Sequence, residues 1–279
     1  MDIWRLLITP PAHGAWNMAV DESILETMGS SKSLPTLRLY AWEPACLSLG
    51  YAQPLTDVDI PRLQARGWEM VRRPTGGRAV LHIDELTYSV IAPLHEPRVA
   101  GTVLESYRRL AQALVQALNL LTCANSTSAG RLPVQVNENS SAPHAPITNP
   151  VCFEVPSTYE ITIGGKKLVG SAQARRIEGV LQHGSLPLAG DLTRIIQILA
   201  FPDEASRASA AGRLLSRATT VETALARKIS WDEAAQAYIS AFKSVLALDL
   251  QPGYLTDDEK KRTEELVRVK YGHPSWTGR

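Results

Sequence analysis

The stretch TYEITIGGKKLVGSAQARRIEGVLQHGSLPL, residues 158–188, is the part of the sequence that best indicates the fold. Two segments typical of strands flank the neighbouring glycines Gly164 and Gly165, and a third such segment follows at 179–188. Adjacent glycines readily take the positive φ angles of a two-residue hairpin turn. Because so few residues separate the segments, they predict antiparallel pairing without a crossover helix.

The first half of the chain adds further strands. Residues 36–42 alternate apolar and polar side chains, and ACLSLGY (45–51) follows as a second strand after a Glu43-Pro44 break. The segments GWEMVRR, GRAVLH and LTYSVIAPL have the same character, with Gly, Pro and acidic residues between them. These short, closely spaced segments predict a sheet that is mainly antiparallel.

Two helices are expected beside these strands. In NMAVDESILETM (17–28), Asp21 and Glu22 suit the first turns of a helix. Residues 103–121 repeat leucine, tyrosine and alanine at three- and four-residue steps, which indicates a long amphipathic helix. The connection at 123–150 is rich in Ser, Asn, Pro and Ala, and we predict one short strand in it, at LPVQV.

From about residue 191 the sequence is typical of helices. Three capping boxes mark helix starts there: Thr219 with Glu222, Ser230 with Glu233, and Thr256 with Glu259. We therefore predict an α+β fold with a mixed, mainly antiparallel sheet and flanking helices. The catalytic domain would span 1–190, and a helical C-terminal extension over 191–279 would pack on it.

The charge balance excludes one class of function. The 279 residues include 29 Lys and Arg against 28 Asp and Glu, for a formal charge of +1 without long like-charge runs. Proteins that hold nucleic acid through a broad basic face need a marked positive excess. We expect no nucleic-acid partner, and we expect the charged residues to be dispersed over a solvated surface.

The three cysteines, Cys46, Cys123 and Cys152, exclude two kinds of site. They form no CxxC pair, so neither a disulfide framework nor a zinc site is predicted. An acidic residue at position 2 and only a brief apolar run do not fit a signal peptide. No window approaches the ~18 apolar residues of a membrane span. We predict a cytoplasmic protein with no membrane association.

The segment VRRPTGGRAVLH, residues 71–82, is the most unusual motif. Gly76 and Gly77 would let the backbone approach a ligand closely. Arginines in this segment pair well with phosphate or carboxylate, and a histidine follows the last of them. An ordinary glycine turn with solvated arginines explains the same residues equally well. Spacing alone leaves both interpretations open.

Cys152 also has two interpretations. It fits a small buried core residue, and it fits a nucleophile, because even a small thiolate fraction reacts strongly. A neighbouring cation would raise that fraction. Lys167, fifteen residues further on and just after the glycine turn, is the candidate partner, whereas Lys166 would point to the opposite face of the strand.

These motifs resemble those of the biotin/lipoate protein ligase and octanoyltransferase superfamily, in order and over nearly the whole chain. The resemblance rests on RRPTGGRAVLH with ELTYSV, on NPVCFEVPSTYEI, and on KKLVGSAQARRIEGVLQHGSLPL. Arg78 stands where lipoate ligases typically have a third glycine. That arginine and the downstream VCF resemble the cysteine-dependent octanoyl-carrier-protein:protein N-octanoyltransferases. Such proteins usually carry His-Asp, whereas here Ile83 follows His82 and the acid is Asp84.

The resemblance implies an acyltransferase of lipoate biosynthesis that uses no cofactor. Octanoyl would pass from acyl carrier protein to Cys152 as a thioester, and then to a lysine of a lipoyl domain or of the glycine-cleavage H protein. Lys167 would be catalytic with Cys152, pairing with it or holding the acyl carbonyl. The expected substrate-binding residues are Arg72, Gly76, Gly77, Arg78, His82, Gly170 and Ser171.

Three alternatives remain at this point. In an ATP-dependent lipoate–protein ligase, Arg72 and the glycine pair would hold an acyl-adenylate, and Cys152 would be incidental. An amidotransferase would move octanoyl between two lipoyl-accepting proteins and would also use a cysteine. A non-catalytic module would bind acyl groups or carrier proteins without turnover.

Overall fold

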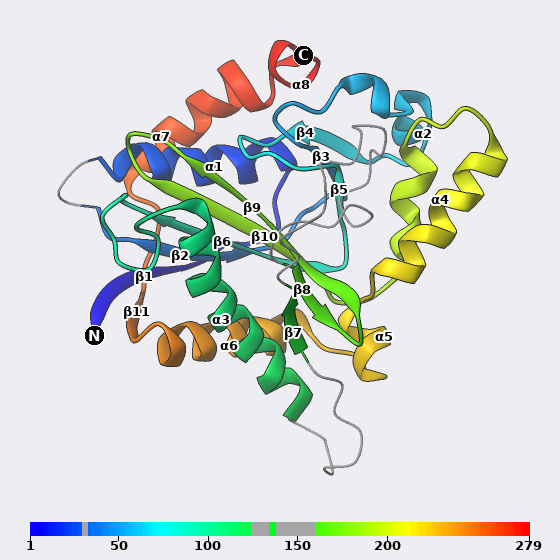
Figure 1. Cartoon of the computed structure of the whole chain (residues 1–279). Coiled ribbons are helices and arrows are strands. Elements are labelled where there is room, and N and C mark those ends of the chain that lie inside the picture. Colours follow the sequence, from blue (N-terminus) through cyan, green and yellow to red (C-terminus); the bar gives the residue numbers. More distant parts are fainter. Residues whose placement is uncertain (30–32, 124–133, 138–159) are drawn as a thin grey trace.

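The computed structural model describes residues 1–29, 33–123, 134–137 and 160–279, and an eight-stranded mixed sheet forms its body (Figure 1). Strand β1 runs parallel to β2 and to β11, and all other neighbours in this sheet are antiparallel. The predicted α+β class with a mainly antiparallel sheet is thus confirmed. The strands in spatial order are β11 (Leu248–Pro252), β1 (Asp2–Ile8), β2 (Thr36–Tyr40), β6 (Glu85–Ala92), β10 (Val180–Pro187), β9 (Lys166–Arg175), β8 (Glu160–Ile163) and β7 (Val134–Asn137).

The hairpin predicted at the two glycines joins β8 to β9. Gly164 and Gly165 have φ angles of 56° and 76°, which are the values that two-residue hairpin turns require and that side chains disfavour. The strand predicted at LPVQV is β7, which pairs with β8. The remainder of the 123–150 connection, at 124–133 and 138–150, lies outside the described residues.

A second, three-stranded sheet lies beside the first. Its strands in order are β4 (Glu69–Arg72), β3 (Cys46–Leu49) and β5 (Val80–His82). β3 is parallel to β4 and antiparallel to β5, so the chain must turn between β4 and β5. That turn is the Pro-Thr-Gly-Gly segment singled out in the sequence, and we call residues 73–79 the glycine loop.

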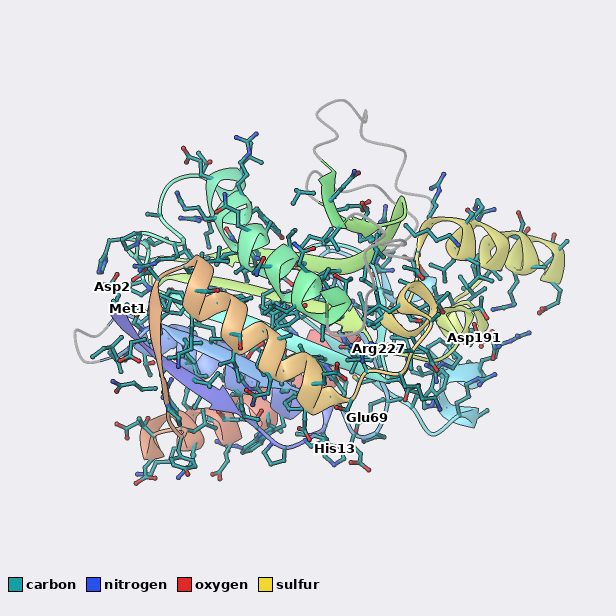
Figure 2. All side chains as sticks on the ribbon, turned by 90° about the horizontal axis from the view of Figure 1, so that it is seen from below. Met1, Asp2, His13, Glu69, Asp191 and Arg227 are labelled. Atoms are coloured by element: carbon teal, nitrogen blue, oxygen red, sulfur yellow. The ribbon has the colours of Figure 1, made fainter. Side chains whose placement is uncertain are left out.

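Helices cover both faces of the large sheet. One face carries α3 (Val103–Cys123) and α6 (Trp231–Val245), which lie side by side in Figure 2, and the other carries α1 (Gly14–Thr27) and α7 (Asp257–Leu266) (Figure 1). Side chains of β6 alternate between these layers. Tyr88 and Val90 pack with α3 and α6, whereas Ile91 packs with α1.

The part of the chain after residue 190 is mostly helical, as predicted, but it also contributes β11. This strand completes the large sheet beside β1. Neither β1 nor β11 was predicted from the sequence. The boundary at residue 190 stays a prediction. The remaining elements are α2 (Ile60–Ala65), α4 (Glu204–Arg217), α5 (Val221–Leu225), α8 (Pro274–Thr277), the 3₁₀ turns Leu55–Asp57 and Leu192–Ile198, and a π-helical turn at Val267–Tyr271.

Two of the three predicted helix caps are confirmed. Ser230 caps α6, and Thr256 forms a complete capping box at α7. The third prediction is wrong by one residue, because Thr220 rather than Thr219 caps α5. The backbone of Thr219 is held elsewhere, since its N–H donates to the carbonyl of Lys167 at 3.0 Å.

The expectation that charged residues lie on a solvated surface is wrong for several of them. Helix α1 begins at Gly14, whose N–H donates to Glu69 Oε2 at 3.0 Å, so Asp21 and Glu22 lie in its middle rather than in its first turns. Both are buried. Asp21 forms an ion pair of 2.8 Å with Arg38, and both side chains are fully inaccessible. Buried charges persist where such partners replace water.

Among the residues that the structure describes, no helix combines the length and the apolar character needed to cross a bilayer.

Candidate active site

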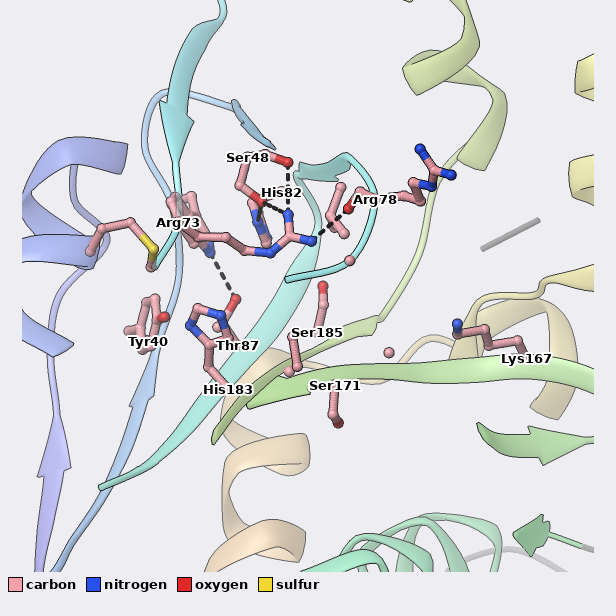
Figure 3. A pocket seen from close by; sticks show the side chains of 17 residues that line it. Tyr40, Ser48, Arg73, Arg78, His82, Thr87, Lys167, Ser171, His183 and Ser185 are labelled. Carbon is pink, nitrogen blue, oxygen red and sulfur yellow. Dashed lines mark hydrogen bonds between the residues drawn. The ribbon is translucent and has the colours of Figure 1, made fainter. Parts of the chain in front are cut away.

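A cavity of about 220 Å³ opens where the glycine loop meets β9 and β10 (Figure 3). Met18, Tyr40, Trp42 and Val80 give it apolar walls. Short stretches of β9 and β10 with small side chains form another wall, at 170–172 and 184–185. An apolar pocket with a few converging polar groups is the usual form of a binding site for a small apolar substrate.

Six of the predicted site residues line this one cavity. They come from two separate parts of the chain: Gly77, Arg78 and His82 from the glycine loop and β5, and Lys167, Gly170 and Ser171 from β9. Gly76 precedes the lining residues of the loop. Cys152, the predicted nucleophile, lies outside the described residues.

Arg72 is directed away from the cavity. Its fully buried guanidinium donates to the carbonyls of Gly50 at 2.8 Å, of Gln53 at 2.6 Å and of Arg279 at 2.6 Å. Burial lowers the pKa of this guanidinium, and nearby Arg279 lowers it further. Arg72 therefore supports the strand that leads into the glycine loop, and it does not line the cavity as its predicted role in substrate binding requires.

Arg73 holds the glycine loop from within. Its guanidinium donates to the carbonyls of Ser48 at 2.9 Å, of Gly76 at 2.9 Å and of Arg78 at 2.7 Å. In a trans peptide the carbonyl and the following N–H point in opposite directions. Because the Gly76 carbonyl faces Arg73, the N–H of Gly77 faces away from it, and that N–H has no hydrogen-bond acceptor among the described residues.

The loop fits only because of two glycines. Gly77 has a φ of 93°, in the region that favours glycine. A Cβ on Gly50 would meet the Gly77 carbonyl oxygen at 1.9 Å. Here the close backbone approach is between two segments of the protein, and the predicted approach of this loop to a ligand stays a prediction.

His82 is fixed by both ring nitrogens. Its Nδ1 lies 2.7 Å from Glu85 Oε1, its Nε2 lies 2.7 Å from Ser48 Oγ, and Trp42 stacks on the ring at 4.0 Å. The acid that accompanies the histidine is thus Glu85. Asp84, which follows Ile83, instead forms an ion pair of 2.8 Å with Arg194.

His183 on β10 has a similar setting. Its Nε2 lies 2.7 Å from Thr75 Oγ1, and its Nδ1 lies 3.5 Å from Asp21 Oδ2. Burial lowers the pKa of His183, although Asp21 acts in the opposite direction. The imidazole is therefore neutral at pH 7. Figure 3 shows His183 beside Tyr40 at the end of the cavity away from Lys167.

Lys167 lies at the other end, and its side chain is only 4% exposed. Its Nζ forms an ion pair of 2.8 Å with Glu160 across the β8–β9 hairpin. Lys166 lies on the opposite side of the strand, as predicted, and its Nζ donates to the Leu215 carbonyl at 2.7 Å. The site therefore contains one of the two neighbouring lysines.

Cys46 is a core residue, as predicted. It is fully buried against α1 and Val71, and burial raises the pKa of its thiol well above the ordinary range. Such a thiol is a poor nucleophile. The thiol of Cys123 is not described. In the described part of the chain, no group of three or more His, Cys, Asp or Glu side chains could hold a metal ion.

Residues 13–243 match the family described as the lipoyl protein ligase A/B catalytic domain. This chain belongs to that family. The match includes the glycine loop, Lys167 and the 138–159 segment that contains Cys152. The resemblance inferred from the motifs is confirmed.

Curated members of the lipoyl protein ligase A/B family match along the whole chain. Octanoyltransferase LipM from Moorella thermoacetica is 40% identical over 279 residues, which are 100% of this chain and 98% of that protein. Octanoyltransferase LipM from Symbiobacterium thermophilum is 38% identical over 278 residues, covering 99% of this chain and 98% of the relative.

A solved member has the same fold. The bi-partite lipoate protein ligase of Thermoplasma acidophilum superimposes with a TM-score of 0.81 and 25% identity, over 100% of this chain and 97% of that one. The two proteins therefore share the sheet with helices on both faces.

Several cavity residues of this family member were not predicted from the sequence. Ser48, Thr87 and Ser185 lie on three different strands, and the sequence analysis assigned none of them a role. One signal was available: Ser48 is the polar residue in the apolar strand CLSL, and a buried polar residue needs a partner. Its partner, His82, lies 34 residues away, so spacing could not identify it.

Proposed function

We propose that this protein is an octanoyltransferase of lipoate biosynthesis and that it works through a thioester on Cys152. The predicted class, an octanoyl-transferring enzyme, is confirmed by full-length relatives that carry this name. The thioester, the donor and the particular acceptor are our proposals. The observation that carries them is the convergence of Lys167, the glycine loop and His82 on one apolar cavity.

In the first step, the Cys152 thiolate attacks the carbonyl of octanoyl-acyl carrier protein. A new carbon–sulfur bond forms, the original thioester bond breaks, and the phosphopantetheine thiolate leaves and takes up a proton. One thioester replaces another, so this step needs no ATP. The apolar walls formed by Met18, Trp42 and Val80 would hold the eight-carbon chain.

Lys167 would stabilise the charges of this step. A cation beside a cysteine favours the thiolate, and a cation or N–H beside the carbonyl stabilises the oxyanion. The N–H of Gly77 faces away from Arg73 and is a candidate oxyanion donor. Glu160, 2.8 Å from the amine, would keep Lys167 oriented.

In the second step, the ε-amine of a lysine on the acceptor attacks the octanoyl-enzyme. An amide forms, and the Cys152 sulfur leaves and regains its proton from the amine. The acceptor is a lipoyl domain, as expected for this family, and we propose the glycine-cleavage H protein as one form of it. Gly170 and Ser171 leave room beside β9 for the acyl carbonyl.

The hydrogen bonds of Arg72 favour transfer over ATP-dependent ligation. A ligase would need cations directed at an acyl-adenylate phosphate. Here the guanidinium groups of Arg72 and Arg73 donate to main-chain carbonyls. This use of Arg72 argues against the ligase role considered for it, whereas Arg73 and Arg78 still line the cavity.

The test is to incubate the protein with octanoyl-acyl carrier protein and to measure its mass. We expect an octanoyl adduct that hydroxylamine removes, that is absent from Cys152→Ala and that is unchanged in the matched variant Cys123→Ala. Octanoyl transfer at the wild-type rate by Cys152→Ala would contradict the mechanism. ATP–pyrophosphate exchange stimulated by lipoate would show a ligase instead.

A further inference from the structure

Two hydrogen-bonded relays hold the glycine loop and the strand beside it. The first relay consists of Ser48, His82 and Glu85, and the second of Thr75, His183 and Asp21. In each, a hydroxyl group contacts Nε2 of a histidine, and Nδ1 of that histidine faces a carboxylate. The second relay reaches the loop itself, since Thr75 immediately precedes Gly76 and Gly77.

The direction of the hydrogen bonds in the second relay follows from Asp21. Its carboxylate accepts from Arg38 at 2.8 Å, from Tyr40 at 3.0 Å and from Ser89 at 2.9 Å, so it carries the negative charge. Nδ1 of His183 therefore bears the proton that faces Asp21, and Nε2 accepts from the hydroxyl of Thr75. The Thr75 side chain is fixed in one orientation.

The first relay has the same direction. The Glu85 carboxylate accepts from the hydroxyls of Thr87 and Ser185 as well as from His82 Nδ1. His82 Nε2 then accepts from Ser48, whose oxygen accepts in turn from Arg73 at 3.1 Å. Arg73 links the two relays, because the same guanidinium holds the Gly76 carbonyl.

Neither hydroxyl is placed to react with a substrate. Ser48 is 0% exposed and Thr75 is 1% exposed, although Ser48 contributes to the cavity wall. Both oxygens already have the partners described above. Because neither oxygen is accessible to a substrate carbonyl, we assign both side chains to holding the backbone in place.

We infer that Thr75 and Ser48 are positioning residues, which, through His183 and His82, hold the glycine loop so that the N–H of Gly77 faces the acyl carbonyl. This inference rests on the proposed octanoyl transfer. Arg73 sets the direction of the Gly76–Gly77 peptide, and the relay through Thr75 sets its position relative to β10. An oxyanion donor is effective only when it is held in advance at the right place.

The experiment follows formation of the octanoyl-enzyme in a single turnover with excess octanoyl-acyl carrier protein. Thr75→Val keeps the size of the side chain but removes the hydroxyl. We expect its rate constant at saturating donor to fall about tenfold or more, since a displacement of ~1 Å can cost on the order of 100-fold. The donor concentration at half-saturation should be unchanged, and Thr75→Ser should recover most of the rate. Ser48→Ala should behave like Thr75→Val.

The amplitude, which is the fraction of enzyme that forms the adduct, distinguishes a positioning role of Thr75 from a role in folding. A folding defect lowers the fraction of active enzyme and therefore the amplitude, whereas a misplaced loop lowers the rate constant at full amplitude. Thr263→Val is the matched control, because Thr263 is a buried threonine that bonds to Ser23 and Glu259 far from the cavity. Its rate constant should equal that of the wild type.

Two results would overturn the inference. If the wild type forms the adduct and Thr75→Val forms it with a rate constant within twofold, the relay does not position the loop. If Thr75→Val changes only the amplitude, its role is in folding. Absence of an adduct in the wild type itself would instead refute the proposed function, and the inference with it.

Discussion

At the scale of single residues, Lys166 and Lys167 provide a direct comparison. They are neighbours with the same side chain, but Lys167 lines the cavity and pairs with Glu160, whereas Lys166 bonds to a carbonyl of α4. Lys167→Met should slow formation of the octanoyl-enzyme by at least about 100-fold, the usual effect of losing a group that assists proton transfer or stabilises charge. Lys166→Met should stay within twofold. Single-turnover mass spectrometry measures both, and equal rates for the two variants would remove Lys167 from the mechanism.

Part of this site could be predicted from the sequence. Lys167, Gly77 and His82 were found because they belong to short motifs with a recognisable order. The relays were missed because their members are far apart: Thr75 and His183 are separated by 108 residues. Helix α1 packs against β10, which carries His183, and against β4, which leads to Thr75, and this packing brings the two side chains together.

At the scale of elements, the segment around α8 supports the end of β4. The indole N–H of Trp276 donates to the Arg72 carbonyl at 2.8 Å, and Arg72 donates to the carbonyls of Trp276, Thr277 and Arg279. Deleting residues 273–279 leaves this buried guanidinium with fewer acceptors, at a cost of about 1–3 kcal/mol for each unsatisfied charged group. We expect the free energy of unfolding to fall by about 3 kcal/mol, as measured by urea denaturation.

The matched control for this deletion is Arg279→Ala. It removes a guanidinium that stacks on Trp276 at 3.8 Å but keeps the carbonyl that Arg72 uses. Arg279→Ala should lower the free energy of unfolding by less than about 1 kcal/mol, which is the usual contribution of an exposed cation–π contact. Equal losses for the two changes would mean that the stacking, rather than the bonds to Arg72, holds this segment.

Prediction of the elements succeeded where the local signal was strong. The hairpin at Gly164 and Gly165, the long helix α3 and the caps at Ser230 and Thr256 all have local causes. Strand β11 was missed because it is five residues long, and only its partner β1 identifies it. The first turn of α1 was misplaced because the acceptor of its first N–H is the side chain of Glu69, 55 residues away in the sequence.

At the scale of the whole molecule, buried carboxylates tie distant segments together. Glu22 on α1 accepts from Lys270 at 2.6 Å and also from Tyr271 and Arg176, and Glu259 accepts from Arg5 at 2.6 Å. Burial raises the pKa of each carboxyl, but the bonds from these partners outweigh it, and both pKa values lie below the ordinary 4.5.

These lowered pKa values predict how stability depends on pH. Because the pKa values of Glu22 and Glu259 are lower in the folded protein than in the unfolded chain, the unfolded state binds more protons at low pH. The stabilisation from both carboxylates is complete above about pH 4.5 and is lost as the pH falls through the folded pKa values. His183, whose pKa also lies below its ordinary 6.5, adds an earlier decline that begins near that pH.

Thermal unfolding between pH 7 and pH 3 measures this dependence. Glu22→Gln should unfold at a lower temperature at pH 7 and show a smaller decline with acid. Glu26→Gln, on the same helix, is the control, because the Glu26 side chain is 30% exposed where it pairs with Arg262. A steep decline below pH 4.5 that is identical in Glu22→Gln and the wild type would contradict this account.

The hydrogen-bond partners of Arg72 near residue 276 are synthesised long after Arg72 itself. Arg72 bonds to Trp276, a residue 204 positions later in the chain, and β1 is covered on one edge only by β11. Before these segments are synthesised, the nascent protein has an open sheet edge, and the end of β4 lacks the hydrogen bonds between Arg72 and residues 276–279. Its activity should therefore appear abruptly, after residues 276–279 have left the exit tunnel, rather than growing with chain length.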